Sequence, residues 1–202
     1  MMTMEIKRIR KLNNLFVVDL NDEISLSLPE SVFVRHNLYK GKELGEEDLL
    51  DIRKDGERQI AIDFALKKLR NRKTTWEIKD LLFKEGIDED AILAAVDYLQ
   101  DYGFLNDREY AELYARDKRN LNGYGPVKIR YLLKQKGVDD ELIADALEHF
   151  TQDDEIELVE KIVHKKYVRN RNLSKEKTKI IRFLLSRGFE YSAIKAVLSR
   201  WP

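Results

Sequence analysis

The sequence predicts a mostly α-helical protein in which three tandem three-helix repeats form an elongated, curved array behind a small β-rich N-terminal segment. The main observation is a segment centred on a glycine, which occurs at Gly86, Gly137 and Gly188 with a constant spacing of 51 residues. The same apolar positions recur around these glycines: Ile78, Ile129 and Ile180; Leu82, Leu133 and Leu184; Ile92, Ile143 and Ile194. A constant period without gaps is the signature of a repeat protein.

Each repeat is expected to contain three helices, the second of which ends at the glycine. The apolar residues before it fall at helical spacing, and glycine adopts the left-handed conformation of a helix C-terminus without a Cβ clash. Acidic runs beginning at Asp88 and Asp139 are suited to start the third helix. We also expect capping boxes at Asn106–Glu109 and Thr74–Glu77, and a similar helix start at Thr151.

The N-terminal segment differs from the repeats because it carries short runs of β-forming residues. These runs are Leu15–Leu20, Ile24–Leu28 and Val32–Arg35, and the first two are predicted to pair as a hairpin. An acidic start at Glu46 then opens a helix that we expect to break or bend near Gly56.

These features divide the chain into four parts. Residues 1–56 form the β-rich region with a connecting helix, and the three repeats occupy residues 57–105, 106–150 and 151–202. The last repeat is the basic part of the chain, with 12 basic and 7 acidic side chains.

Composition excludes several classes of protein. The chain has 37 basic and 37 acidic residues, so net charge points to no partner, and 43% hydrophobic residues exclude a disordered chain. It has no cysteine, which fits a reducing cytoplasm. No apolar run approaches the roughly 20 residues of a membrane helix. We therefore expect a cytoplasmic monomer without a membrane segment.

Basic residues gather at the end of the first helix of each repeat and in the loop that follows. They are Lys67, Lys68, Arg70, Arg72 and Lys73 in the first repeat, Arg116, Lys118 and Arg119 in the second, and Lys165, Lys166, Arg169, Arg171, Lys175 and Lys177 in the third. Stacked repeats present equivalent positions on one face, so these residues are predicted to form a basic stripe. The stripe would meet a polyanion or an acidic protein surface; the alternative is a solvated loop face.

Two further motifs give the repeats a family resemblance. They are Gly103-Phe-Leu-Asn-Asp107 and the run from Gly125-Pro126 through Ile129 and Leu133 to Gly137-Val138. With the helix before them, they resemble the RecX family of bacterial recombination regulators over residues 57–202. The β-rich segment with Asn37–Gly41 looks like that of the longer Gram-positive members. One departure is Thr75, which stands where family members often have a serine after Arg-x-x.

The resemblance implies a regulatory role. RecX proteins bind the RecA recombinase on single-stranded DNA, lodge in the groove of its filament and limit filament growth or promote disassembly. Strand exchange, ATP hydrolysis and repressor cleavage in the SOS response are thereby held down. Some members also bind DNA themselves, so single- or double-stranded DNA is a second expected partner.

No catalytic, metal or cofactor site is predicted, and the protein is not expected to be an enzyme. The histidines share no metal-ligand spacing; they are His36, His149 and His164. The Gly123-Tyr-Gly125 run lacks the residues of a phosphate loop. The acidic clusters recur at helix starts, where capping explains them better than paired catalytic carboxylates.

Two alternatives to the RecA-directed function stay open. The helix–glycine–helix unit resembles a helix-turn-helix DNA-binding regulator, but Asp88 and Asp139 would open its recognition helices in the first two repeats and repel phosphates. The third repeat lacks this objection. A general helical scaffold for other proteins is the second alternative.

The two tryptophans receive different predictions. Trp201 falls at a core position of the third repeat. Trp76 falls at a helix start and is the better candidate for an exposed ring that stacks on a base, with packing against the protein as the competing interpretation.

Overall fold

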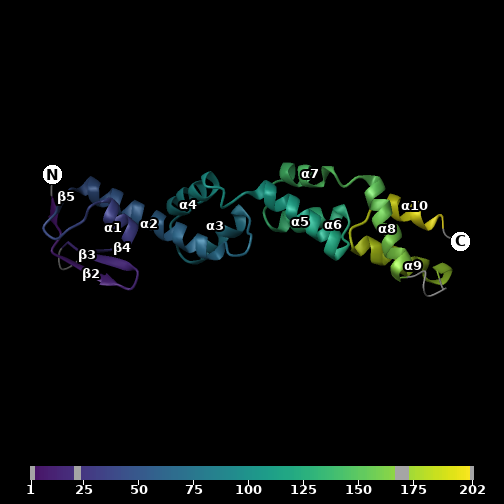
Figure 1. The fold of residues 1–202 in the computed structure, drawn as a ribbon, viewed down its shortest axis with the longest axis horizontal. Helices are drawn as coiled ribbons and strands as arrows, with labels where there is room; N and C mark the ends of the chain where they lie inside the picture. The colour runs from purple at the N-terminus through teal and green to yellow at the C-terminus, as the bar shows by residue number, and fades with distance from the viewer. Residues whose placement is uncertain (1–2, 21–23, 167–172, 201–202) are drawn as a thin grey trace. The chain divides into compact units, whose positions relative to one another are not determined.

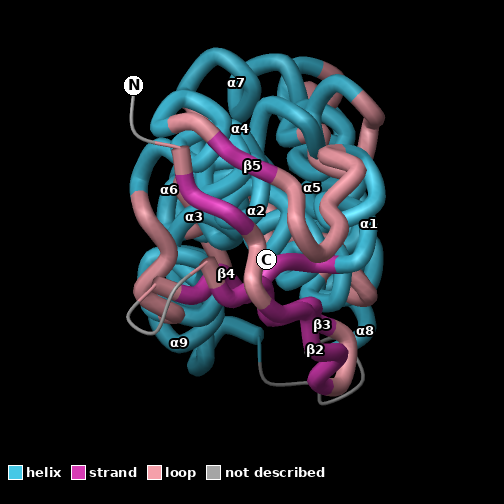
Figure 2. Tube along the Cα trace, turned by 90° about the vertical axis from the view of Figure 1, so that its left-hand side faces the viewer, coloured by secondary structure: helices cyan, strands magenta, loops and turns pink. Residues whose placement is uncertain are grey.

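The computed structural model describes residues 3–20, 24–166 and 173–200. These residues form five strands and ten helices (Figure 1). The strands are confined to the N-terminal segment and helices make up most of the rest of the described residues (Figure 2), so the predicted mostly helical class with a small β-rich N-terminal segment is confirmed. The chain divides into two compact units, residues 1–73 with 77–105, and residues 74–76 with 106–202.

The first unit opens with two small antiparallel sheets. Strand β1 (Met4–Glu5) pairs with β5 (Glu43–Leu44). Strands β2 (Arg8–Leu12), β3 (Leu15–Asp19) and β4 (Ser25–Pro29) form the second sheet in that order. The predicted hairpin is therefore confirmed as β3 and β4.

The prediction of a strand at Val32–Arg35 is wrong, because these residues belong to helix α1 (Glu30–Arg35). Pro29 stands at the N-cap, and Phe33 of the helix stacks on Phe16 of β3 with ring centroids 4.2 Å apart. Tertiary packing of the apolar face thus overrides the β preference of the branched residues.

Helix α2 (Glu46–Lys68) is continuous, so the first form of the prediction, a break near Gly56, is wrong, and a bend there stays a prediction. Gly56 is buried, and a Cβ at this position would lie 2.8 Å from Cδ2 of Leu28 in the sheet. The glycine therefore serves close packing of β4 on the helix. Ile52 in the first half of α2 packs in the core of the β-rich region, whereas Ala61 in the second half packs in the core of the first repeat.

The remaining helices follow the predicted order, and each group of three encloses a core of its own. They are α3 (Thr75–Lys84), α4 (Glu89–Asp101), α5 (Asp107–Asn122), α6 (Pro126–Gln135), α7 (Asp140–Glu148), α8 (Gln152–Lys166), α9 (Leu173–Ser186) and α10 (Tyr191–Leu198). The apolar residues that defined the period are buried in every copy: Ile78, Ile129, Ile180, Leu82, Leu133, Leu184, Ile92, Ile143 and Ile194. The predicted core position Trp201 lies outside the described residues.

The three repeated glycines share one backbone conformation. Their φ angles are +77° at Gly86, +70° at Gly137 and +80° at Gly188. In each copy the N–H of the next residue donates to the carbonyl of the leucine four positions before the glycine, with an N···O distance of 3.2 Å. The predicted left-handed helix end is confirmed.

Helix starts also follow the sequence in most places. The side chains of Asn106 and Asp88 accept bonds from backbone N–H groups in the first turns of α5 and α4. Thr151 and Asp154 form a reciprocal capping box. The side chain of Asp139 makes no such bond, so its acidic run is matched to the helix dipole alone.

Within the second unit, helix ends meet through equivalent hydrogen bonds. The N–H of Gly125, just before α6, donates to the carbonyl of Arg187 at the end of α9, with an N···O distance of 2.9 Å. One period earlier, the hydroxyl of Thr74 donates to the carbonyl of Lys136 at the end of α6, at 2.6 Å. The positive end of one helix thus satisfies the negative end of another.

These contacts leave no room for a side chain at the glycine. A Cβ on Gly188 would lie 2.2 Å from the backbone nitrogen of Lys128, and one on Gly137 would lie 2.4 Å from Cβ of Trp76. A Cβ on Gly86 would meet nothing within 4 Å. The later glycines are therefore required for backbone conformation and for close approach.

We expect Gly188→Ala to destabilise its unit more than Gly86→Ala destabilises the other unit. Gly86→Ala removes only the left-handed preference, for a loss of about 1 kcal/mol. Gly188→Ala also displaces the start of α6, and we expect at least twice that loss. Hydrogen exchange in increasing urea measures each unit separately. Equal losses at the two positions would show that the close approach has no energetic weight.

Candidate partner-binding surfaces

The first group of basic-stripe residues lies at the end of α2. Lys67 and Lys68 occupy its last turn, and Arg70, Arg72 and Lys73 follow in the loop before α3. All except the half-buried Lys73 are exposed. None of the five forms an ion pair with a residue that the structure describes, and the ammonium of Lys68 lies 4.9 Å from the ring centroid of Phe64. Their charges are therefore not neutralised by a carboxylate of the described residues.

The second group is less available, because Arg119 is engaged inside the protein. Its Nη2 donates to Oδ1 of Asp154 at 2.6 Å, and its guanidinium lies 4.5 Å from the ring centroid of Phe150. Lys118 is half-buried with its ammonium 5.0 Å from an aromatic ring, and Arg116 is exposed. Arg119 thus joins α5 to the start of α8 rather than facing a partner.

The carboxylate that Arg119 contacts is held in its charged form. Hydrogen bonds from Thr151, and then from Arg119, place the pKa of Asp154 below its ordinary value. The ion pair with Arg119 and the capping box with Thr151 therefore share the carboxylate of Asp154, which lies at the junction of α5 and α8.

The third group lies partly outside the described residues. Lys165 near the end of α8 and Lys177 in α9 are exposed. Arg169 and Arg171 fall outside the described residues, and the side chains of Lys166 and Lys175 also fall outside the description. Whether the three groups form one stripe stays a prediction.

Charge in the second and third repeats is separated by helix, which the sequence analysis missed. Residues 123–138, which contain α6, carry four cations and no acid, and residues 177–189 of the α9 region do the same. Helix α7 carries four acids and no cation. Counting charge over the whole second repeat cancels this pattern, and counting it helix by helix would have revealed it.

Exposed large side chains accompany these cations. Trp76 is 51% exposed and Tyr131 is 53% exposed, and Val127 and Leu185 are also largely exposed. Trp76 therefore lies at the surface, as the stacking interpretation requires, although its Cβ packs close to Gly137.

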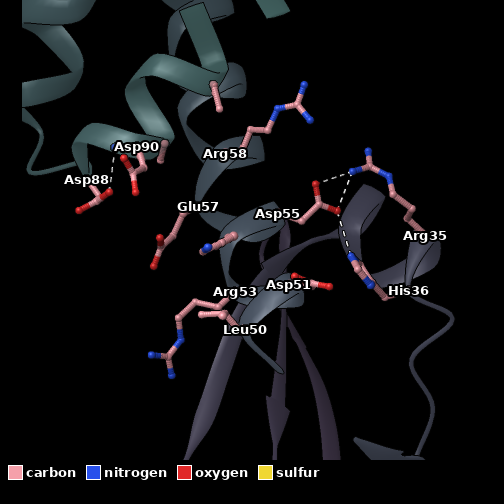
Figure 3. Close-up of a pocket in the computed structure, with 13 residues that line it drawn as sticks. Arg35, His36, Leu50, Asp51, Arg53, Asp55, Glu57, Arg58, Asp88 and Asp90 are labelled. Atoms are coloured by element: carbon pink, nitrogen blue, oxygen red, sulfur yellow. Dashed lines mark hydrogen bonds and ion pairs between the residues drawn. The ribbon is translucent and has the colours of Figure 1, made fainter. Parts of the chain in front are cut away.

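A hollow of the first unit lies along α2 and has a volume of about 730 Å³ (Figure 3). Arg35 and His36 both point at Asp55, with Nη1 of Arg35 and Nε2 of His36 lying 2.7 and 3.0 Å from its Oδ2. Asp88 on another wall caps α4. These groups serve each other, so they tie α1 to α2 rather than form a ready ligand site.

One acid of the second unit is buried, but its contacts are structural. Oε1 of Glu155 accepts the N–H of Glu190 at 2.6 Å, where α10 begins. Burial raises the pKa of Glu155, and the hydrogen bond opposes this effect. Among the described residues no group of His, Cys, Asp and Glu side chains could hold a metal ion, and no helix is long and apolar enough to cross a membrane.

The helical repeats match known protein domains. Residues 106–147 match the family model for the second three-helix domain of RecX, and residues 153–198 match that for its third three-helix domain.

Whole proteins with the same name are similar over most of the chain. The regulatory protein RecX of Bacillus licheniformis is 35% identical over 182 residues, covering 89% of this chain and 69% of that protein. RecX of Clostridium perfringens is 30% identical over 188 residues, covering 91% and 88%.

Solved structures of RecX proteins share the fold. A crystal structure of a regulatory protein RecX has a TM-score of 0.75 and 26% identity, and the match covers 97% of this chain and 99% of that one. The structure of RecX from Lactobacillus salivarius has a TM-score of 0.63 and 30% identity, and covers 71% and 96%.

We expect Arg119→Ala to lower the melting temperature of the second unit by about 3 to 6 °C. Because the pKa of Asp154 is lowered by folding, its stabilising effect is present above its unfolded pKa and is lost as pH falls through the folded pKa. The difference from wild type should therefore shrink below about pH 4. Calorimetry across pH measures this, with Arg116→Ala as the matched control. Equal melting temperatures for the two variants would contradict the structural role of Arg119.

Proposed function

The chain belongs to the RecX family of regulatory proteins, and on that basis we propose that it binds the RecA recombinase filament on single-stranded DNA and restrains its growth and activities. The proposed setting is the cytoplasm, in recombination, DNA repair and the SOS response. The proposed form is a monomer. The relatives are named as regulatory proteins, which is not an enzyme class.

The observation that carries this proposal is the family's three-helix repeat, present here with its glycine caps and separate cores. A polymer such as a recombinase filament offers the same surface many times. Repeats that carry equivalent groups can therefore each bind the polymer weakly and together give a high overall affinity, because the first contact raises the effective concentration of the next.

The basic stripe is the proposed contact surface for the filament. Exposed cations without internal partners are the ones that a polyanion or an acidic protein surface can use. Lys67, Arg70 and Arg72 meet this condition at the end of α2, and Arg116 is exposed in the second repeat. Lys68 is exposed too, with its ammonium 4.9 Å from the ring centroid of Phe64. Arg119 is left out of the proposed contact because Asp154 already binds it.

A helix-turn-helix regulator of double-stranded DNA is the second candidate. Helix α10 favours it, because this helix carries Lys195 and no acid. Helix α7 in the equivalent position opposes it, because its four acids would face the phosphates of a duplex.

We expect the purified chain to slow ATP hydrolysis by the cognate recombinase on single-stranded DNA at substoichiometric amounts. One molecule that limits filament growth affects many recombinase subunits. Steady-state ATP hydrolysis with increasing amounts of the chain measures the effect. Unchanged hydrolysis, together with binding of a defined duplex operator, would favour the second candidate.

The same measurement tests the basic stripe. We expect Lys67→Ala, Lys68→Ala and Arg70→Ala together to weaken inhibition roughly tenfold and to flatten its salt dependence. Lys40→Ala, Arg53→Ala and Lys54→Ala remove the same charge elsewhere in the first unit and serve as the control. Inhibition that is equal in both triple variants would remove this group from the contact surface.

A further inference from the structure

The outward side of the middle helices in the second unit is a surface of unusual composition. The exposed positions of α6 include Val127, Arg130, Tyr131 and Lys134, which lie on one side of the helix because they are spaced by three and four residues. The exposed Gln135 follows them and donates from Nε2 to the hydroxyl of Tyr131 at 2.7 Å. The buried Ile129 and its core neighbours lie on the opposite side. The surface is therefore one continuous band along α6.

Helix α9 presents the equivalent positions one period later. Thr178, Arg182 and Leu185 are exposed there, while Ile180 and Leu184 are buried. Both helices thus turn the same edge to solvent. We call the exposed residues of α6 and α9, together with Trp76, the middle-helix face.

The middle-helix face is continuous because the helix ends are hydrogen-bonded to one another. The N–H of Val127 donates to the carbonyl of Gly188 at 3.1 Å, which places the end of α9 against the start of α6. At the other end of α6, Trp76 packs on Gly137. The exposed rings and cations therefore follow one another along a line.

The cations on this face are available. Neither Arg130 nor Arg182 forms a hydrogen bond or ion pair with any residue in the described part of the chain. Lys134 pairs with Asp140 at the surface, where both side chains are largely exposed and the pair is weak. Lys128 holds its ammonium 5.1 Å from the ring centroid of Tyr131.

A single-stranded nucleic acid has the chemistry that matches this face. Cations that track a backbone, alternating with exposed aromatic rings on which bases stack, are the elements of a single-strand binding surface. A duplex would bring its phosphates to the cations but keep its bases stacked internally, so no base would stack on the rings of Tyr131 and Trp76. An acidic protein would satisfy the cations without giving the two rings their stacking role.

We infer that the middle-helix face binds single-stranded nucleic acid directly, with Arg130 and Arg182 contacting phosphates and Tyr131 and Trp76 stacking on bases. This deepens the proposed function by assigning a DNA-contacting surface separate from the basic stripe. Binding at this face requires no recombinase, so it can be measured without one and can fail independently of filament inhibition.

The experiment is fluorescence anisotropy of a labelled oligothymidylate of about 30 nucleotides with the full chain and no recombinase. We expect Arg130→Ala with Arg182→Ala to weaken binding roughly tenfold. The slope of log affinity against log salt should fall by about 1.4, because each lost contact with a single strand contributes about 0.7. Arg53→Ala with Lys54→Ala removes the same charge from another exposed surface, and we expect wild-type binding.

Tyr131 tests stacking apart from charge. We expect Tyr131→Ala to weaken binding at least fivefold, and Tyr131→Phe to bind as wild type because it keeps the ring. Circular dichroism melting of each variant identifies loss of folding. Tyr131→Phe keeps the aromatic ring of the wild-type chain, so it separates loss of the ring from loss of the hydroxyl.

Three results would overturn the inference. The first is failure of the wild-type chain to bind the oligonucleotide. The second is that the control double variant weakens binding as much as Arg130→Ala with Arg182→Ala. The third is tighter binding to a duplex than to a single strand of the same length. If one of these results is obtained and the chain still inhibits the recombinase, the proposed function is retained and only the direct DNA contact is excluded.

Discussion

The left-handed glycine at the end of each middle helix is the constraint on which the second unit depends. Its positive φ ends the helix, and because glycine has no side chain, the start of another helix can approach the helix end closely. Gly188 receives α6 in this way and Gly137 receives Trp76. The approaching segment supplies a donor, either the backbone N–H of Gly125 or the hydroxyl of Thr74. Polar groups that helix ends ordinarily leave to water are thereby satisfied inside the protein.

This constraint also separates the tasks of the helix surfaces. The inner side of every middle helix carries the same isoleucine and leucine pair, because each repeat encloses its own core. The outer side is free to vary, and here it carries cations in two successive repeats while α7 carries acids. In the second repeat the cations of α6 and the acids of α7 cancel in the net charge. Net charge is thus a poor guide to the partners of a repeat protein, because partners meet one helix at a time.

The sequence predicted what depends on the period and missed what depends on contacts between distant segments. Helix ends and core positions follow from local spacing, so at the described residues they were correct, apart from the side-chain cap expected at Asp139. The helix at Glu30–Arg35 was missed because stacking of Phe33 on Phe16 outweighs local β preference, and Gly56 was misread because only its contact with Leu28 explains it. The internal role of Arg119 could not be predicted either, because its partner lies 35 residues away on another helix.

Arg119 also shows why counting basic residues is not enough to locate a binding surface. A cation that already has a carboxylate partner offers a polyanion little, because the partner must be displaced or left unpaired. The cations at the end of α2 and those on the outer sides of α6 and α9 lack such partners among the described residues, apart from the exposed Lys134 and Lys179 pairs. Two surfaces therefore combine charge with availability, and only the middle-helix face adds exposed aromatic rings. A nucleoprotein filament presents both protein and DNA, and these are the two kinds of partner for which the two surfaces are proposed.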